Sequence, residues 1–334
     1  MKKIVVIGAG GFGTALALTF LKAGHNVTLK PRREEHAAEM RSAGENQQYL
    51  KGISFPKELM IDADPKCLKL ADIVVVATPV QRTPEILNEY KNVLPHEVPL
   101  IIASKGILTT DPFNTPFISS WLKKHMPSHP VYVLSGPNFA SEIARGLPAA
   151  ATLAHFDTMA AKEMAITLWH EHFRIYPSID QLGVEFCGAV KNVYAIACGI
   201  CVGLNLGQNA LATLVTRGLA EIKRLGIRQG AHADTFLGLS GVGDLMLTCT
   251  STQSRNMTLG IELAKGRSVA DIMAERHTIA EGVATSKALH DLVKKSDISM
   301  PIAAAVYQIV HENESVKDVI SGLLSRHEVR FEGT

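Results

Sequence analysis

The sequence carries little surplus charge of either sign. Its 334 residues include 34 Lys and Arg against 32 Asp and Glu, a formal net charge of +2 at pH 7. Proteins that bind nucleic acids usually show a marked basic excess, so we expect no nucleic-acid partner. Cysteines are also few, and their odd number of five favours a reducing compartment over a disulfide framework. We therefore expect a cytoplasmic protein.

Long apolar runs are scarce. The N-terminal stretch MKKIVVIGAGGFGTALALTFL resembles a signal peptide, but several closely spaced glycines interrupt its apolar run. No other segment offers the roughly 18 or more unbroken apolar residues that a membrane span needs, so we expect no membrane partner. The length suits two domains, because a single core rarely grows past about 250–300 residues.

The N-terminal pattern is typical of a dinucleotide site. Residues 4–7 predict a buried parallel strand, residues 14–21 a helix, and residues 27–29 a second strand. The glycines with the spacing Gly-x-Gly-x-x-Gly are Gly8, Gly10 and Gly13. The first permits a tight turn, the second lets the backbone approach a pyrophosphate, and the third lets helix and strand pack closely. Free amides at the helix N-terminus favour the same anion.

The residues after the second strand indicate which dinucleotide binds. Sites that prefer NAD usually place an acid there for the ribose hydroxyls, whereas this sequence has Arg32 and Arg33. These arginines could take a 2′-phosphate, or they could form a solvated basic turn. We expect NADPH to be favoured over NADH.

Further buried strands are predicted at 72–77, 100–103 and 131–134. Ligands of an open parallel sheet bind beyond the carboxyl ends of its strands, where Lys105 and Gly136 fall. Helical patterns then dominate from residue 183. They are predicted at 186–204, 208–225, 231–237, 256–265, 268–275, 283–293 and 301–310.

The fold class is therefore α/β. We expect a Rossmann-type doubly wound sheet domain at 1–182, followed by an all-α domain at 183–334, with the reaction between them.

Lys191 is an unusual residue of the first long helix. It lies in EFCGAVKNVYAIACGICVG, which is apolar on all sides and has Glu185 as its only acid. A lysine there must reach solvent, find a carboxylate or lose its proton. Because burial lowers the pKa of an amine, Lys191 is a candidate general acid and base for reduction of a ketone.

A polar segment, GLSGVGDLMLTCTSTQSRN at 238–256, contains the second candidate group. Ser254, Arg255 and Asn256 would suit a phosphate monoester, although a serine- and threonine-rich loop with a helix cap would look similar. Asp244 could pair with Lys191, bind the substrate or cap a helix.

The combined motifs resemble those of the bacterial NAD(P)-dependent glycerol-3-phosphate dehydrogenases. They are GAGGFGTALA, SKGI, SGPNFASEIARGLPAA, AVKNVYAIACGI, GVGDLMLTCTSTQSRN and AEGVAT, and they span nearly the whole chain in the family's order. The resemblance implies reduction of dihydroxyacetone phosphate to glycerol 3-phosphate, a phospholipid precursor, with Lys191 as the catalytic residue. A homodimer is also expected, from the apolar surface of the helical domain.

The resemblance also implies residue roles. The cofactor-binding residues would be Gly8, Gly10, Gly11, Phe12, Gly13, Arg32, Arg33, Lys105, Ala140, Arg255 and Glu281. The substrate-binding residues would be Lys105, Gly136, Asn138, Lys191, Asp244, Ser254, Arg255 and Asn256. At Asn138 the chain departs from the family, whose members usually carry Ser or Thr.

Alternatives remain open. A β-hydroxyacid dehydrogenase could also use a Lys-Asn pair on a helix, and a dinucleotide-binding redox sensor would lack catalysis. No metal is expected, because the His170-Glu171-His172 cluster lacks further spaced ligands. The Cys198-x-x-Cys201 spacing lies inside the apolar helix and is interpreted as core packing.

Overall fold

The computed structural model describes residues 1–114, 116–275, 280–294, 296 and 298–325. The chain forms two compact units, the first from Met1–Ser104 and Ile118–Gln181, the second from Lys105–Phe117 and Leu182–Thr334. The predicted division assigned residues 105–117 to the first domain, and this is corrected. Ile107 and Phe117 are buried in the hydrophobic core of the helical unit, which holds the segment there.

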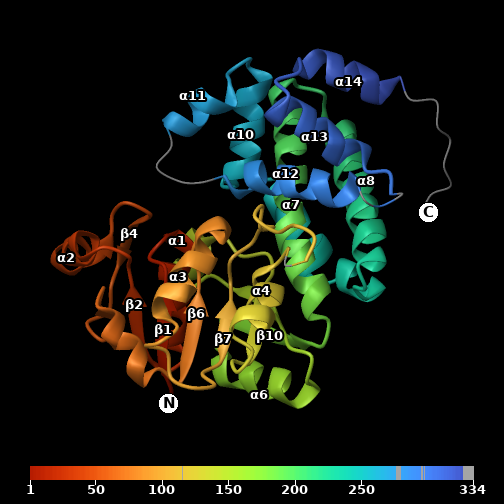
Figure 1. The fold of residues 1–334 in the computed structure, drawn as a ribbon. Helices are drawn as coiled ribbons and strands as arrows, with labels where there is room; N and C mark the ends of the chain where they lie inside the picture. The colour runs from red at the N-terminus through yellow and green to blue at the C-terminus, as the bar shows by residue number, and fades with distance from the viewer. Residues whose placement is uncertain (115, 276–279, 295, 297, 326–334) are drawn as a thin grey trace. The chain divides into compact units, whose positions relative to one another are not determined.

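The first unit contains an eight-stranded sheet (Figure 1). Its strands are β1 (Lys3–Ile7), β2 (Asn26–Lys30), β5 (Met60–Ile61), β6 (Ile73–Val76), β7 (Leu100–Ile102), β8 (Val131–Ser135), β9 (Ala149–Ala154) and β10 (Phe173–Ser178), in the order β10-β9-β8-β7-β6-β1-β2-β5. Neighbouring strands are parallel except β8 and β9, which are antiparallel. The strands predicted near residues 4, 27, 72, 100 and 131 are confirmed as β1, β2, β6, β7 and β8.

Strands β9 and β10 were not predicted from the sequence. β9 reads AAATLA, with only one β-branched residue, and β10 reads FRIYPS, with a proline that cannot donate a ladder hydrogen bond. Both strands therefore depend on tertiary pairing with the preceding sheet.

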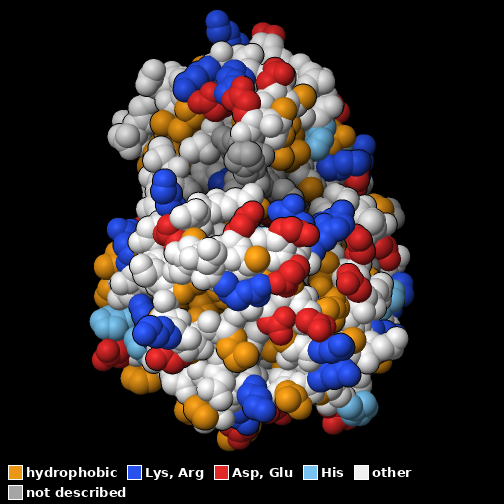
Figure 2. All heavy atoms as spheres, turned by 90° about the vertical axis from the view of Figure 1, so that its left-hand side faces the viewer, with side chains coloured by type: hydrophobic (Ala, Val, Ile, Leu, Met, Phe, Trp, Pro, Cys, Tyr) orange, Lys and Arg blue, Asp and Glu red, His pale blue; other side chains and the backbone are white. Residues whose placement is uncertain are grey.

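The α-helices of this unit are α1 (Gly11–Lys22), α2 (Glu34–Ala43), α3 (Thr83–Tyr90), α4 (Ile118–His125), α5 (Ala140–Arg145) and α6 (Thr158–Leu168). A small hairpin pairs β3 (Glu45–Asn46) with β4 (Leu50–Ser54). In Figure 1, α3 and α4 lie on the side of the sheet that faces the viewer. The face shown in Figure 2 carries Lys and Arg side chains interspersed with Asp and Glu.

The second unit is helical. Its α-helices are α7 (Gln181–Gly203), α8 (Gln208–Arg228), α9 (Asp244–Cys249), α10 (Arg255–Ala264), α11 (Val269–Ala274), α12 (Glu281–Lys294), α13 (Pro301–His311) and α14 (Val316–Leu324). The predicted helix at 231–237 is a 3-10 helix at Ala233–Leu237, and a π-helical turn at Leu239–Gly243 leads into α9.

Helix α7 forms the centre of this unit, buried along most of its length. Its small residues allow a neighbouring helix to approach closely, because a Cβ at Gly199 or Gly260 would overlap the backbone of the facing helix, α10 or α7. The helix is long and apolar enough to cross a membrane, but 83% of its most apolar window is buried inside the protein. The pattern is that of a core helix.

Candidate active site

Lys191 lies in α7 with its side chain only 9% exposed. Its Nζ donates a hydrogen bond of 2.6 Å to Asp244 Oδ1 and another of 2.6 Å to Thr248 Oγ1. Of the outcomes that the sequence left open, the structure shows that Lys191 finds a carboxylate and does not reach solvent.

Asp244 pairs with a second ammonium as well. Its side chain is 1% exposed, and Oδ2 accepts a hydrogen bond of 2.6 Å from Lys105 Nζ. The tight turn at Gly241, where a side chain would overlap the backbone, brings Asp244 to the first position of α9. Thr248 follows one helical turn later and donates to Asp244 O. One carboxylate thus pairs with two cations.

The surroundings of Lys191 lower the pKa of its side chain toward neutral pH. Burial lowers the pKa of Lys191 from 10.5 to about 8; Asp244 opposes this shift and Lys105 adds to it. An amine with such a pKa can hold or release a proton at cellular pH, as a general acid and base requires.

An amide chain holds the elements around Lys191 together. Asn192 Nδ2 donates a hydrogen bond of 3.4 Å to Lys105 O, and Asn192 Oδ1 accepts one of 2.9 Å from Asn256 Nδ2. Asn256 Oδ1 in turn accepts 3.0 Å from the backbone amide of Gly282, at the start of α12. Asn256 therefore joins α7, α10 and α12, and its predicted contact with substrate stays a prediction.

The start of α10 gathers the residues predicted to hold a phosphate. Ser254 caps this helix, its Oγ accepting 3.2 Å from Met257 N, and Arg255 is the first helical residue. Burial lowers the pKa of the Arg255 guanidinium, while the nearby Glu281 carboxylate raises it. A cation at a helix N-terminus can hold a dianion.

The three glycines of the turn in the first unit differ in their surroundings. Gly8 has φ of 107°, and a Cβ there would lie 2.6 Å from Ala77 O. A Cβ at Gly13 would overlap Gly8 O, whereas one at Gly10 would meet nothing within 4 Å. The first and third glycines thus serve packing, and the second leaves open space at the N-terminus of α1. This arrangement fits a dinucleotide pyrophosphate.

Other predicted cofactor residues surround this turn. A Cβ at Gly11 would lie 2.9 Å from Tyr49 O and 3.6 Å from Ala140 Cβ, so packing also requires a small residue there. Phe12 is partly buried against the core of the sheet unit. Their contacts with the cofactor remain predictions.

The end of β2 presents Arg32 and Arg33 as exposed side chains. The side chain of the last strand residue, Lys30, is buried instead. Its Nζ donates hydrogen bonds of 2.8 Å to Ala63 O and 3.0 Å to Tyr90 OH. No acid therefore occupies the end of this strand, where an NAD site usually has one.

Gly136 and Asn138 lie together after β8. A Cβ at Gly136 would come within 2.9 Å of Ala150 O, which explains the glycine. Asn138 Nδ2 donates 2.9 Å to both Pro137 O and Ala150 O. Its Oδ1 is buried and makes no hydrogen bond with any residue in the described part of the chain, and its predicted contact with substrate stays a prediction.

Two residues beside Lys191 were not among the predicted site residues. Thr248 binds the Lys191 ammonium, and Asn192 connects Lys105 to α10. The spacing of Thr248, four residues after Asp244, would have indicated a shared helix face.

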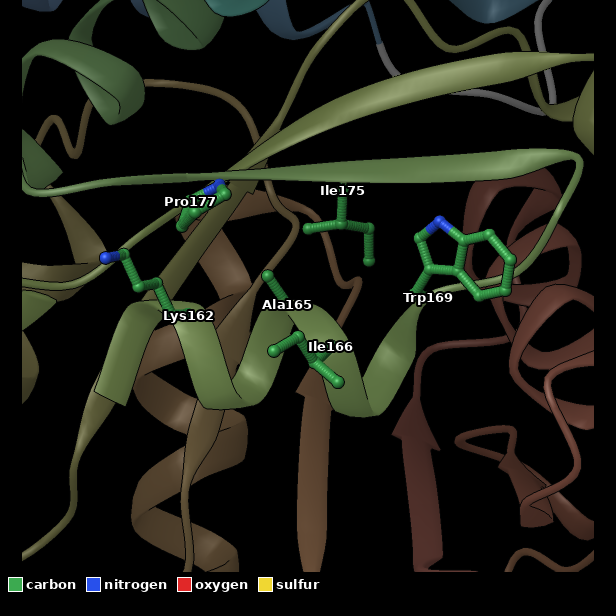
Figure 3. Close-up of a pocket in the computed structure, with 6 residues that line it drawn as sticks. All are labelled: Lys162, Ala165, Ile166, Trp169, Ile175 and Pro177. Atoms are coloured by element: carbon green, nitrogen blue, oxygen red, sulfur yellow. The ribbon is translucent and has the colours of Figure 1, made fainter. Parts of the chain in front are cut away.

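A separate hollow of about 420 Å³ lies on the sheet unit between α6 and β10 (Figure 3). It is lined by Lys162, Ala165, Ile166, Trp169, Ile175 and Pro177. One ionisable side chain among apolar ones offers little chemistry, so we place the candidate site at Lys191. Over the described ranges, no group of three or more His, Cys, Asp or Glu side chains could hold a metal ion.

Two family models together match most of this chain. The sequence model for the N-terminus of NAD-dependent glycerol-3-phosphate dehydrogenase matches residues 3–161, and the C-terminus model matches 180–321. The glycerol-3-phosphate dehydrogenase [NAD(P)+] of Rhodospirillum rubrum is 43% identical over 331 residues, covering 99% of this chain and 94% of the relative.

Solved structures agree. The glycerol-3-phosphate dehydrogenase of Coxiella burnetii has a TM-score of 0.92 at 34% identity, covering 97% of this chain and 99% of that one. The enzyme of Saccharomyces cerevisiae has a TM-score of 0.81 at 27% identity, covering 96% and 98%.

Proposed function

Because the chain belongs to the NAD-dependent glycerol-3-phosphate dehydrogenase family, we propose that it reduces dihydroxyacetone phosphate to glycerol 3-phosphate. Members are oxidoreductases of CH–OH groups that use NADH or NADPH. The observation that carries the proposal is the buried Lys191, paired with Asp244 and with a pKa of about 8. The product would supply phospholipid synthesis.

Lys191 acts as the proton donor in this proposal. When bound, the reduced nicotinamide supplies a hydride to the carbonyl carbon. The Lys191 ammonium gives a proton to the carbonyl oxygen, which completes the secondary alcohol and leaves a neutral amine. Asp244 and Thr248 hold Nζ in place, so that the amine loses little freedom in the step. In the reverse direction the neutral amine takes the hydroxyl proton.

The phosphate of the substrate would bind at the start of α10. Ser254 and Arg255 offer a hydroxyl and a guanidinium beside the helix N-terminus, and Lys105 adds a cation next to Asp244. Asn256, the next residue of α10, is held to α7 by its hydrogen bond to Asn192. A carboxylate substrate has fewer acceptor oxygens for these donors, which favours the phosphate over a hydroxy acid.

The dinucleotide would bind at the glycine turn, with Arg32 and Arg33 as the residues for a 2′-phosphate. Both side chains are exposed at the end of β2, where the inward Lys30 leaves no acid for ribose hydroxyls. We therefore propose that NADPH is preferred.

An absorbance assay tests the activity and the preference together. We expect the purified protein to oxidise NADPH with dihydroxyacetone phosphate, with a higher kcat/KM for NADPH than for NADH. A panel of keto acids serves as the control. Turnover of keto acids alone would identify a hydroxyacid dehydrogenase, and cofactor binding without any turnover would identify a sensor.

We also propose a cytoplasmic homodimer, supported by the five free cysteines and an apolar surface on α6 and β10, one edge of the sheet. The exposed large side chains in these two elements and directly beside them in the chain are Phe156, Met159, Ile166, Trp169, Tyr176 and Ile179. Sedimentation equilibrium should give a dimer for the wild type and a monomer for Ile166→Glu. The matched control, Leu324→Glu in α14, removes an equally exposed side chain and should stay dimeric. A monomeric wild type contradicts the proposal.

A further inference from the structure

A buried side chain of the hairpin formed by β3 and β4 contacts the glycine turn. Asn46, in β3, is 0% exposed. Its Nδ2 donates two hydrogen bonds of 2.9 Å, one to Ala9 O and one to Thr14 Oγ1. Ala9 lies between the first two glycines of the turn, and Thr14 lies in the first part of α1. Neither partner is near Asn46 in sequence, so the contact is tertiary.

The opposite end of the Asn46 amide is also held. Its Oδ1 accepts 3.3 Å from Tyr49 N and 3.4 Å from the His36 ring. The amide thereby uses both donor hydrogens and both acceptor positions, which fixes its orientation. The Tyr49 backbone in turn lies so close to Gly11 that a Cβ there would be 2.9 Å from its oxygen. The hairpin therefore supports the turn at two points.

The bond to Ala9 O determines where an amide of the turn points. The Ala9 carbonyl and the Gly10 N–H belong to one peptide unit, which is planar and trans, so the two groups point in opposite directions. By holding Ala9 O toward the hairpin, Asn46 aims the Gly10 N–H away from it. Gly10 is also the position where a side chain would meet nothing within 4 Å, the open side of the turn. An amide that points into that space is available to an anion.

We propose that Asn46 is a positioning residue for the dinucleotide, because it sets the plane of the Ala9–Gly10 peptide before the pyrophosphate binds. The inference rests on the dinucleotide part of the proposed function and not on the identity of the substrate. Asn46 itself contacts no ligand in this scheme. Its effect on binding is preorganisation: without it, the peptide must be ordered when the cofactor arrives.

The test compares Asn46→Ala with Thr14→Val by fluorescence titration of the folded proteins with NADPH. Asn46→Ala frees the Ala9 carbonyl, and the dissociation constant for NADPH should rise about tenfold, the size of one lost hydrogen bond. Thr14→Val is the matched control. Thr14 is equally buried and shares the Asn46 amide, but its loss leaves the bond to Ala9 O in place. Its dissociation constant should change less than about twofold.

Kinetics provide a readout that simple destabilisation would not move. In Asn46→Ala the KM for NADPH should rise with the dissociation constant, while kcat at saturating NADPH and the KM for dihydroxyacetone phosphate stay near wild type. Should Asn46→Ala fail to fold, Asn46→Leu keeps about the same size, adds no charge and has no donor for Ala9 O, and the same rise is expected.

The outcomes separate this inference from the proposed function. An unchanged dissociation constant for NADPH in the Asn46 variants, together with a lower melting temperature, would show a purely structural residue and overturn the inference. A wild type that binds NADPH but does not turn over dihydroxyacetone phosphate would overturn the proposed substrate and leave the binding comparison intact. A wild type that binds neither dinucleotide would overturn both.

Discussion

Lys191→Ala is expected to lower kcat for ketone reduction by about 10²–10⁴-fold, the usual contribution of a general acid. The variant removes the amine whose proton completes the alcohol. NADPH binding should persist, because the glycine turn belongs to the other unit. Stopped-flow single turnovers with NADPH fluorescence would measure chemistry and binding on the same sample.

Tyr194→Phe provides a matched control on the same helix. Tyr194 is also deeply buried and donates a hydrogen bond of 2.9 Å to Glu221, but within the described part of the chain it makes no hydrogen bond to Lys191 or Asp244. We expect a lower melting temperature and an unchanged kcat. A Lys191→Ala enzyme with near wild-type kcat would remove the proposed role of the amine.

The pH dependence should differ in sign between the two directions. Below a pKa of about 8, Lys191 is an ammonium and can donate a proton, so kcat/KM for ketone reduction should be level there and fall above it. Oxidation of glycerol 3-phosphate needs the neutral amine, so its kcat/KM should rise through the same pH and then level off. Limbs of the same sign, or a limb near the ordinary lysine pKa, would contradict the assignment.

Asp244→Asn should have the second-largest effect. The substitution removes the carboxylate that pairs with both the Lys105 and the Lys191 ammonium, and breaking a buried ion pair typically costs about 3–5 kcal/mol. Asp244 raises the pKa of Lys191, so its loss should lower that pKa further below its ordinary value. The falling limb of ketone reduction should therefore move to lower pH, and unfolding in urea should occur at a lower midpoint.

Thr248→Val distinguishes charge from hydrogen bonding in this cluster. It removes a neutral partner of the Lys191 ammonium but keeps Asp244. The falling limb of the pH profile for ketone reduction should therefore move less than in Asp244→Asn. A limb that stays in place in Asp244→Asn, or moves to higher pH, would show that the carboxylate does not control the titration of Lys191.

Local patterns in the sequence were sufficient for much of the fold. Strand β1, the glycine turn and α1 follow from a β-branched run, three spaced glycines and a helical segment, all within a few residues. The apolar sequence around Lys191 likewise predicted a buried helix, and α7 is that helix. Strand β9 could not be recognised in this way, because an alanine-rich segment has no strong preference for a strand.

The sequence alone determined which residue types the protein has for hydride transfer chemistry: the glycine turn, the buried lysine and the segment with Arg255. Only the tertiary structure decided their partners. Asp244 lies 53 residues from Lys191 and 139 from Lys105, and Asn46 lies 37 residues from Ala9. Helix and strand preferences act over a few neighbouring residues, whereas the pKa of a buried amine and the direction of a peptide depend on groups that meet only when the core packs.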